Sequence, residues 1–305
     1  MTAGGTGRDW IAELRAELAG RYEVERELAR GAMSRVFIAR DLARNRSVAL
    51  KALPPELASA TNGERFLREI AITSQLEHPN ILPLFDSGVS GIHFWYTMPL
   101  VEGESLRQRL KTTGPFDTGQ ALEVADQVGA ALDHAHSHGV VHRDLKPENV
   151  MRLEDKWVVL DFGLARALES DGRLTGVNMP LGTPPYMSPE QITGAATVDA
   201  RADIYGFGCL MYEVVTGRPP FLGTTVVHFL RAHLQEIPAP PSQLRPGVTP
   251  SFDRTVLKAL EKKPDARYQR ALEMIADFRA GSAPPAAEPS PPKPTGGLLN
   301  RLFGR

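Results

Sequence analysis

The chain has 305 residues, of which 42% are hydrophobic and 23% are charged, an ordinary composition for a soluble globular protein with one large domain or two lobes. Thirty-five basic residues stand against thirty-six acidic ones, and the resulting net charge of −1 argues against a general nucleic-acid binder. The single cysteine, Cys209, excludes an intrachain disulfide, and its apolar neighbours predict a small buried side chain rather than a reactive thiol.

Two further patterns concern location. No apolar stretch approaches the ~20 residues that a membrane-spanning helix needs, and the N-terminal residues lack the apolar core of a secretory signal. We therefore expect a cytoplasmic protein with no transmembrane segment. After Gly281 the sequence is Pro-rich, which predicts a linker. The last nine residues carry Leu, Phe and Arg without an acid and predict either a frayed tail or a weak membrane-surface or partner-docking element.

The first third of the chain begins with a helical pattern and continues with strand patterns. Between residues 8 and 20, Trp10, Leu14 and Leu18 fall on one face of a helix. From Tyr22 the period changes to two, which indicates strands. The elements expected here are a helix at 8–20, strands at 22–28, 36–40 and 47–53, a helix at 63–76, and strands at 81–88 and 92–100. Successive short strands predict an antiparallel sheet.

The remainder of the chain has helical patterns. Asp117 with Gln120 resembles a capping box, which predicts a helix that continues to about Ser137. Further helices are expected at 197–216, 223–236, 251–262 and 270–280. A β-rich first third followed by helices predicts an α+β protein with two lobes. The expected parts are an N-terminal amphipathic helix at 1–20, a first lobe at 21–101, a second lobe at 102–280, and the linker with its short basic tail at 281–305.

The segment His142–Asn149 reads HRDLKPEN, and twelve residues after Asn149 the tripeptide DFG begins at Asp161, directly behind the apolar strand pattern WVVL. Phosphoryl transfer from ATP needs a group that orients the nucleophile, oxygen ligands for Mg²⁺ and a cation on the phosphates. These motifs, in this order, resemble the eukaryotic-type protein kinases, particularly the bacterial Ser/Thr members, over about residues 21 to 280. The resemblance implies a bilobal kinase fold, with a small antiparallel β-sheet N-lobe that carries one key helix and a larger, mainly helical C-lobe.

The resemblance also implies roles for the motif residues. Asp144 would accept or orient the proton of the substrate hydroxyl, and Lys146 would contact the transferring phosphate, as in Ser/Thr-directed kinases. Asn149 and Asp161 would hold Mg²⁺, with Mn²⁺ as the alternative ion. The implied activity is that of a non-specific Ser/Thr protein kinase in signalling, which uses ATP and acts on proteins.

The resemblance places the nucleotide in the first lobe. Lys51, in VALK, would reach the α- and β-phosphates with Glu69 as its partner. The phosphate-covering loop reads ARGAMS at 29–34, so Gly31 alone keeps the family's GxGxxG pattern, and Ser34 takes the last position. The residues expected to contact the nucleotide are Leu28, Gly31, Ser34, Val36, Ala49, Lys51, Met98, Leu100, Val101 and Met151, with Met98 as the gate of the back pocket and 99–101 as the hinge.

Regulatory and bracing residues follow from the same resemblance. Arg143 precedes Asp144, the arrangement of kinases whose activation segment is ordered by a phosphate. Thr175 is the favoured phosphorylation site, ahead of Ser170, and autophosphorylation through a kinase-domain homodimer is a family-level expectation. Thr183 resembles the residue that contacts the catalytic aspartate and helps to select Ser/Thr substrates, with a simple turn before Pro184 and Pro185 as the alternative. Three residues are expected to brace the second lobe: Glu190 paired with Arg267, and Asp203, which would tie the catalytic loop to a long helix.

Other interpretations stay open. A phosphate-covering loop that keeps a single glycine of the family pattern would also suit a non-catalytic nucleotide-binding scaffold. A kinase of small-molecule hydroxyls is a third reading, which the peptide-docking type of segment at 161–190 disfavours. His134, His136 and His138 suggest a metal site, although their spacing lets only His134 and His138 meet on one helical face. The simpler interpretation is a helix end that carries satisfied or solvated imidazoles. Many bacterial relatives continue into a transmembrane helix and an outer sensor, so this chain is expected to be either a soluble kinase or a shortened piece of a longer one.

Overall fold

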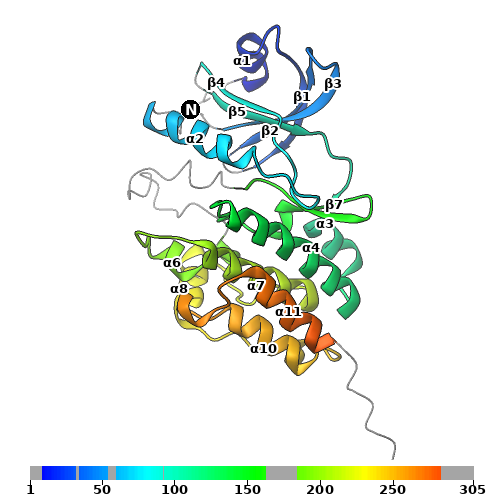
Figure 1. Cartoon of the computed structure of the whole chain (residues 1–305), viewed down its shortest axis with the longest axis vertical. Coiled ribbons are helices and arrows are strands. Elements are labelled where there is room, and N and C mark those ends of the chain that lie inside the picture. Colours follow the sequence, from blue (N-terminus) through cyan, green and yellow to red (C-terminus); the bar gives the residue numbers. More distant parts are fainter. Residues whose placement is uncertain (1–8, 32–33, 54–59, 92, 163–183, 283–305) are drawn as a thin grey trace, which may run out of the picture.

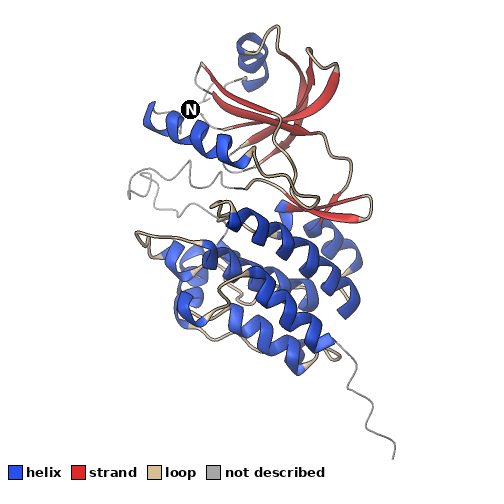
Figure 2. Cartoon of the chain, in the orientation of Figure 1, coloured by secondary structure: helices blue, strands red, loops and turns tan. Residues whose placement is uncertain are grey.

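The computed structural model describes residues 9–31, 34–53, 60–91, 93–162 and 184–282, and it has two lobes (Figure 1). One lobe is built on a five-stranded antiparallel sheet of order β1-β2-β3-β5-β4, and the other is mostly helical (Figure 2). The expected α+β architecture is therefore confirmed. The elements of the first lobe are α1 (Trp10–Glu17), β1 (Tyr22–Arg30), β2 (Arg35–Asp41), β3 (Arg46–Ala52), α2 (Ala60–Thr73), β4 (Asp86–Ser90) and β5 (His93–Pro99).

The expected strand at 81–88 is wrong in its first half, because β4 begins only at Asp86. Ile81 forms an isolated parallel bridge with Val159, and the Leu82 N–H donates to the Val159 carbonyl at 3.0 Å. Pro83 has no N–H to offer a neighbouring strand. This apolar run therefore links the first lobe to the strand that leads into the DFG motif.

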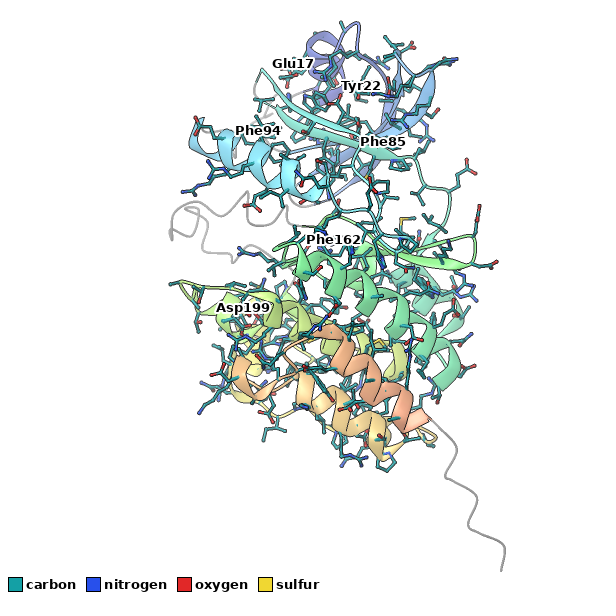
Figure 3. All side chains as sticks on the ribbon, viewed as in Figure 1. Glu17, Tyr22, Phe85, Phe94, Phe162 and Asp199 are labelled. Carbon is teal, nitrogen blue, oxygen red and sulfur yellow. The ribbon has the colours of Figure 1, made fainter. Side chains whose placement is uncertain are left out.

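Helix α1 covers one face of the sheet. Trp10, Leu14 and Leu18 are buried in a cluster with side chains of β1, β2, β3 and β5, among them Phe37 and Trp95. The Arg15 guanidinium donates to the carbonyls of Val24, at 2.6 Å, and Glu25, at 2.7 Å, and these bonds fasten the helix to β1. Figure 3 shows Glu17 and Tyr22 together at this end of the molecule. The first helix is therefore an integral part of the lobe.

The second lobe is built around α7, whose side chains from Ala202 to Val215 are all buried. Cys209 is among them, as expected, and burial raises the pKa of its thiol. The capping box of Asp117 and Gln120 is present at the start of α4, which ends at Ser137 as expected. The elements of this lobe are β6 (Glu104–Ser105), α3 (Leu106–Thr113), α4 (Thr118–Ser137), η2 (Pro147–Asn149), β7 (Val150–Leu153), β8 (Lys156–Val159), η3 (Pro184–Tyr186), α6 (Pro189–Ile192), α7 (Ala200–Thr216), α8 (Val226–Gln235), α9 (Pro241–Leu244), α10 (Pro250–Ala259), η4 (Pro264–Ala266) and α11 (Ala271–Ser282). Within the described ranges, none of the helices has the length and apolar character to cross a membrane.

Candidate active site

The HRDLKPEN loop is anchored to the buried carboxylate of Asp203 on α7. The backbone N–H groups of His142 and Arg143 each donate to it at 2.7 Å, and His136 Nε2 lies 2.8 Å from the same carboxylate. Burial alone would raise the pKa of Asp203, but the hydrogen bond from His136 and the loop amides outweigh it, so the pKa is lowered. Asp203 therefore stays ionised and ties the loop to the core of the lobe, the place that the sequence assigns to it.

Three polar residues of the loop lie together. Lys146 Nζ is 2.5 Å from Asp144 Oδ2, and the Asn149 side-chain amide donates to the Asp144 carbonyl at 2.8 Å. Because its side-chain nitrogen donates to the loop backbone, Asn149 could offer a ligand only its side-chain oxygen. The geometry sets a carboxylate, a cation and an amide oxygen side by side, which suits phosphoryl chemistry.

Asp161 lies between the lobes and has a φ of 62°, a left-handed conformation that is uncommon outside glycine. Lys51 Nζ is 2.5 Å from its Oδ2, and the Tyr96 hydroxyl donates to its Oδ1 at 2.7 Å. Burial would raise the pKa of Asp161, but the Lys51 ammonium and these hydrogen bonds lower it below the ordinary value. Burial, together with the carboxylate, raises the pKa of Tyr96 well above its usual range, so its hydroxyl stays protonated and is a donor.

The residue after Asp161 packs inward. Phe162 is buried in the core of the second lobe, and its ring meets the His142 ring edge-on at 4.8 Å between centroids. His142 Nε2 also lies 2.8 Å from the Leu160 carbonyl. Figure 3 shows Phe162 at the level where the two lobes meet. The HRDLKPEN loop and the start of the DFG segment therefore support one another directly.

The predicted ion pair of Lys51 with Glu69 stays a prediction. Lys51 contacts Asp161 in this structure, and Glu69 lies half-buried on α2, the helix that follows β3. Thr175 and Thr183, and two residues of the phosphate cover, Ala32 and Met33, lie outside the described residues.

The apolar residues predicted to surround the adenine gather under the sheet. Ala49 pairs with Met98 across β3 and β5, and both belong to one cluster with Val36, Leu100 and Val101 at its edge. Two other predicted contacts differ in exposure: Leu28 is 47% exposed, and Met151 on β7 is half-buried.

In the phosphate-covering loop, the Gly31 N–H donates a hydrogen bond to the Ser34 carbonyl at 2.8 Å. Gly31 is not among the glycines with positive φ, so its backbone conformation is open to other residues. A Cβ added there would meet Ser34 atoms at an ordinary 3.4 and 3.6 Å. Any need for glycine here therefore comes from a ligand and not from the fold.

The oxygens of Asp161 and Asn149 are ligands of the hard type that Mg²⁺ takes. The two residues lie at neighbouring ends of the paired strands β7 and β8, where the Leu160 N–H donates to the Asn149 carbonyl at 2.9 Å. Among the residues that the structure describes, no group of three or more His, Cys, Asp or Glu is placed to hold a metal ion. Magnesium bound with nucleotide usually takes only one or two protein ligands and fills its shell with phosphates and waters. The residues present therefore fit this ion.

Glu190 and Arg267 form a bidentate ion pair, at 2.6 and 2.8 Å, that holds the segment after the DFG region against the lobe. A second network was not anticipated from the sequence. Arg107 on α3 bonds to Tyr186 and to Glu213, and Tyr186 bonds to Glu213. The Arg107 Nε also donates to Glu148 of the HRDLKPEN loop at 2.8 Å. Only the fold brings these residues together, because they come from four separate segments.

The histidines near the end of α4 have two different roles. His136 bonds to Asp203, whereas the His134 ring packs in a tilted arrangement against those of His138, at 4.5 Å, and His78, at 5.1 Å between centroids. Burial, with the neighbouring imidazole, lowers the pKa of both His78 and His134. The expected meeting of His134 and His138 is confirmed, and the His134 ring contacts both of the other rings.

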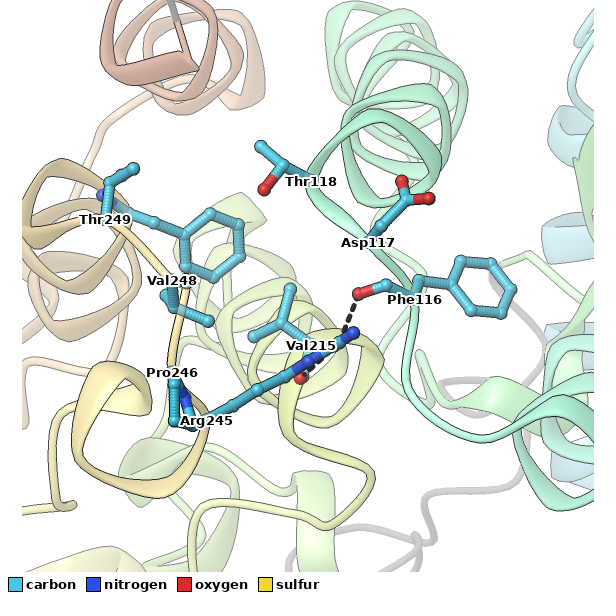
Figure 4. A pocket seen from close by; sticks show the side chains of 10 residues that line it. Phe116, Asp117, Thr118, Val215, Arg245, Pro246, Val248 and Thr249 are labelled. Carbon is cyan, nitrogen blue, oxygen red and sulfur yellow. Dashed lines mark hydrogen bonds between the residues drawn. The ribbon is translucent and has the colours of Figure 1, made fainter.

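A cavity of about 160 Å³ lies away from this site, at the start of α4 (Figure 4). Arg245 crosses it and donates to the carbonyls of Phe116 and Val215, the latter at 2.9 Å. Because the guanidinium is engaged with the backbone at the ends of two helices, we assign this cavity a structural role.

The fold is bilobal, and the HRDLKPEN loop and Asp161 lie where the two lobes meet. The family model "Protein kinase domain" matches residues 22–276, and the chain belongs to that family. The range agrees with the expected 21 to 280.

The relatives are bacterial. The chain is 43% identical over 279 residues to the serine/threonine-protein kinase PknB of Mycolicibacterium smegmatis, and 41% identical over 279 residues to PknB of Mycobacterium leprae. These alignments cover 88% and 89% of this chain but 44% and 45% of the relatives, so the chain spans less than half of their length. The crystal structure of the PknI kinase domain of Mycobacterium tuberculosis superposes with a TM-score of 0.70 at 28% identity, covering 86% of this chain and 96% of that one.

Proposed function

We propose that this chain is a Ser/Thr protein kinase that transfers the γ-phosphoryl group of ATP to hydroxyls of proteins. The observation that carries the proposal is the placement of Asp144, beside Lys146 and Asn149, on a loop anchored to Asp203. The similarity to bacterial serine/threonine-protein kinases supports the same activity.

The reaction follows from the positions of these groups. The substrate hydroxyl oxygen attacks the γ-phosphorus, its proton passes to Asp144, and the bond to the β–γ bridging oxygen breaks so that ADP leaves with the electron pair. Lys146 neutralises charge on the group in transfer, and Lys51 orients the α- and β-phosphates. Mg²⁺, held by Asn149 and Asp161, would supply further charge neutralisation when bound. Manganese is the alternative ion.

The regulatory part of the proposal concerns the segment after DFG. Thr175 would be phosphorylated within a kinase-domain homodimer, and Arg143 would receive the phosphate. Mass spectrometry of active protein tests this, because full activity with Thr175 unmodified would exclude the role.

The activity itself is tested by comparing wild type with Asp144→Asn and Lys51→Met. We expect Asp144→Asn to bind nucleotide like wild type and to transfer no label to a generic protein substrate. Lys51→Met should lose both binding strength and transfer. Wild-type protein that binds nucleotide without transfer would instead favour the scaffold interpretation, which the single glycine of the phosphate cover suggests.

A further inference from the structure

The Tyr96 side chain is fully buried, yet it carries a polar hydroxyl into the apolar cluster under the sheet. A buried hydroxyl is costly unless it is hydrogen-bonded, whereas a phenylalanine would fill the same space with no polar group. The hydroxyl bonds to the Asp161 carboxylate at 2.7 Å. The hydroxyl group of Tyr96 is therefore best explained by its hydrogen bond to Asp161.

The sheet register explains how Tyr96 reaches this carboxylate. Lys51 on β3 and Tyr96 on β5 are direct partners in the antiparallel pairing, so both side chains leave the same face side by side. The ammonium takes one oxygen of Asp161 and the hydroxyl takes the other. The two contacts together fix the rotation of the carboxylate.

Asp161 needs such support because its backbone is in the left-handed region, at a φ of 62°. Each carboxylate oxygen can accept two hydrogen bonds, so both retain a lone pair for another ligand. When Lys51 turns to nucleotide phosphates, its hold on Asp161 weakens, and Tyr96 is then the neutral partner that keeps the carboxylate in place.

We propose that Tyr96 is a positioning residue of the phosphotransfer site, which orients Asp161 toward the metal–nucleotide complex through its hydroxyl. This inference rests on the proposed kinase function. It concerns a residue that acts through Asp161 and does not itself touch the nucleotide.

The test uses Tyr96→Phe, which removes one oxygen and keeps the ring. Affinity for a fluorescent ADP analogue is measured in EDTA and in saturating Mg²⁺, and the ratio of the two dissociation constants is the metal-dependent gain. We expect Tyr96→Phe to leave the affinity in EDTA unchanged and to reduce the gain about tenfold, which corresponds to the ~1.4 kcal/mol of one hydrogen bond to a charged group. A gain within twofold of wild type, or a larger gain, would overturn the proposal.

Tyr212→Phe is the matched control, because Tyr212 is equally buried and its hydroxyl donates at 3.0 Å to the Ala239 carbonyl, in the other lobe. It should keep the wild-type gain. Should Tyr96→Phe fold too poorly for binding to be measured, Tyr96→Met takes its place, with the same thresholds.

Two comparisons complete the test, the first on whether Tyr96 acts through Asp161 and the second on whether the proposed kinase function itself holds. In an Asp161→Asn background, adding Tyr96→Phe should change the gain by less than twofold, and a further tenfold loss there would show that Tyr96 acts elsewhere. Wild-type protein without transfer would refute the proposed kinase function. Wild-type transfer together with an unaltered gain in Tyr96→Phe would refute this inference alone.

Discussion

The carboxylate of Asp203 accepts a hydrogen bond at 2.7 Å from the backbone N–H of Arg143, a residue that has a φ of 67°. A non-glycine residue in this region is strained, by about 1–3 kcal/mol, and persists only where its surroundings hold it. Asp203 is 1% exposed and receives the neighbouring His142 N–H as well. A buried charge in the helical core thus maintains the backbone conformation that presents Asp144.

Replacing this carboxylate should reduce both stability and activity. Asp203→Asn leaves one buried loop amide without an acceptor, so we expect a loss of about 2–3 kcal/mol in the free energy of unfolding. The kcat of the folded fraction should fall more than tenfold, because the loop that carries Asp144 relaxes. Asp253→Asn is the control: Asp253 is 8% exposed and accepts from Ser242. It should destabilise without lowering kcat, and equal kcat values for the two variants would contradict this account.

Acid should destabilise the protein partly through His233. Burial, together with the Lys262 ammonium, lowers the pKa of His233 to about 3 from an ordinary 6.5. Between these values the unfolded chain binds a proton that the native imidazole does not, so stability is full above pH 6.5 and falls as the pH decreases toward 3. The free energy of unfolding, measured by urea denaturation between pH 7 and pH 5, should fall with decreasing pH in wild type. In His233→Gln this pH dependence should be shallower by about 1 kcal/mol per pH unit. His228→Gln, on the exposed side of α8, should keep the wild-type slope, and parallel curves for all three proteins would refute the role of His233.

The first helix should contribute strongly to the stability of its lobe. The Trp10 ring is 8% exposed, and the Arg35 guanidinium lies over it at 4.3 Å. Trp10→Ala should lower the free energy of unfolding by about 3–5 kcal/mol. Ala16→Ser, at an exposed position of the same helix, should cost about 0.5 kcal/mol. Similar denaturant midpoints for the two variants would show that α1 is only loosely attached.

Gly31 should matter for ATP and not for folding. Since its φ is not positive and a Cβ would find ordinary contacts, Gly31→Ala should leave the melting temperature nearly unchanged. The KM for ATP should rise on the order of tenfold, as for a loss of about 1.4 kcal/mol in binding at the phosphates. Gly20→Ala should show the reverse, because Gly20 has a φ of 83°. It should cost stability and leave the KM unchanged, and an unchanged KM in Gly31→Ala would remove Gly31 from the site.

The features that the sequence predicts well are those set by neighbouring residues. The residues of HRDLKPEN are consecutive, so the pattern states their roles, and the capping box at Asp117 marks the start of α4 within one residue. Long-range partners are a different matter. The contacts of Tyr96 with Asp161 and of Arg107 with Tyr186 join residues 65 and 79 positions apart, and they depend on strand register and on helix packing. No local periodicity carries that information.

The apolar run at 81–88 also shows that local sequence does not determine long-range partners. Its composition suits a strand, yet Ile81 and Leu82 pair with Val159 instead of a neighbouring strand of the sheet. The choice between these partners is made by tertiary packing, which outweighs local preference. The three histidines at the end of α4 show the same limit, because only the fold separates His136, bonded to Asp203, from His134 and His138, whose rings contact each other.

The most direct test of the proposed activity is the phosphoamino-acid content of a generic protein substrate after incubation with γ-labelled ATP and Mg²⁺. We predict label on serine and threonine with wild-type protein, and none with Asp144→Asn at equal nucleotide occupancy. Wild-type protein that binds nucleotide but leaves the substrate unlabelled, or equal labelling by Asp144→Asn, would contradict the account.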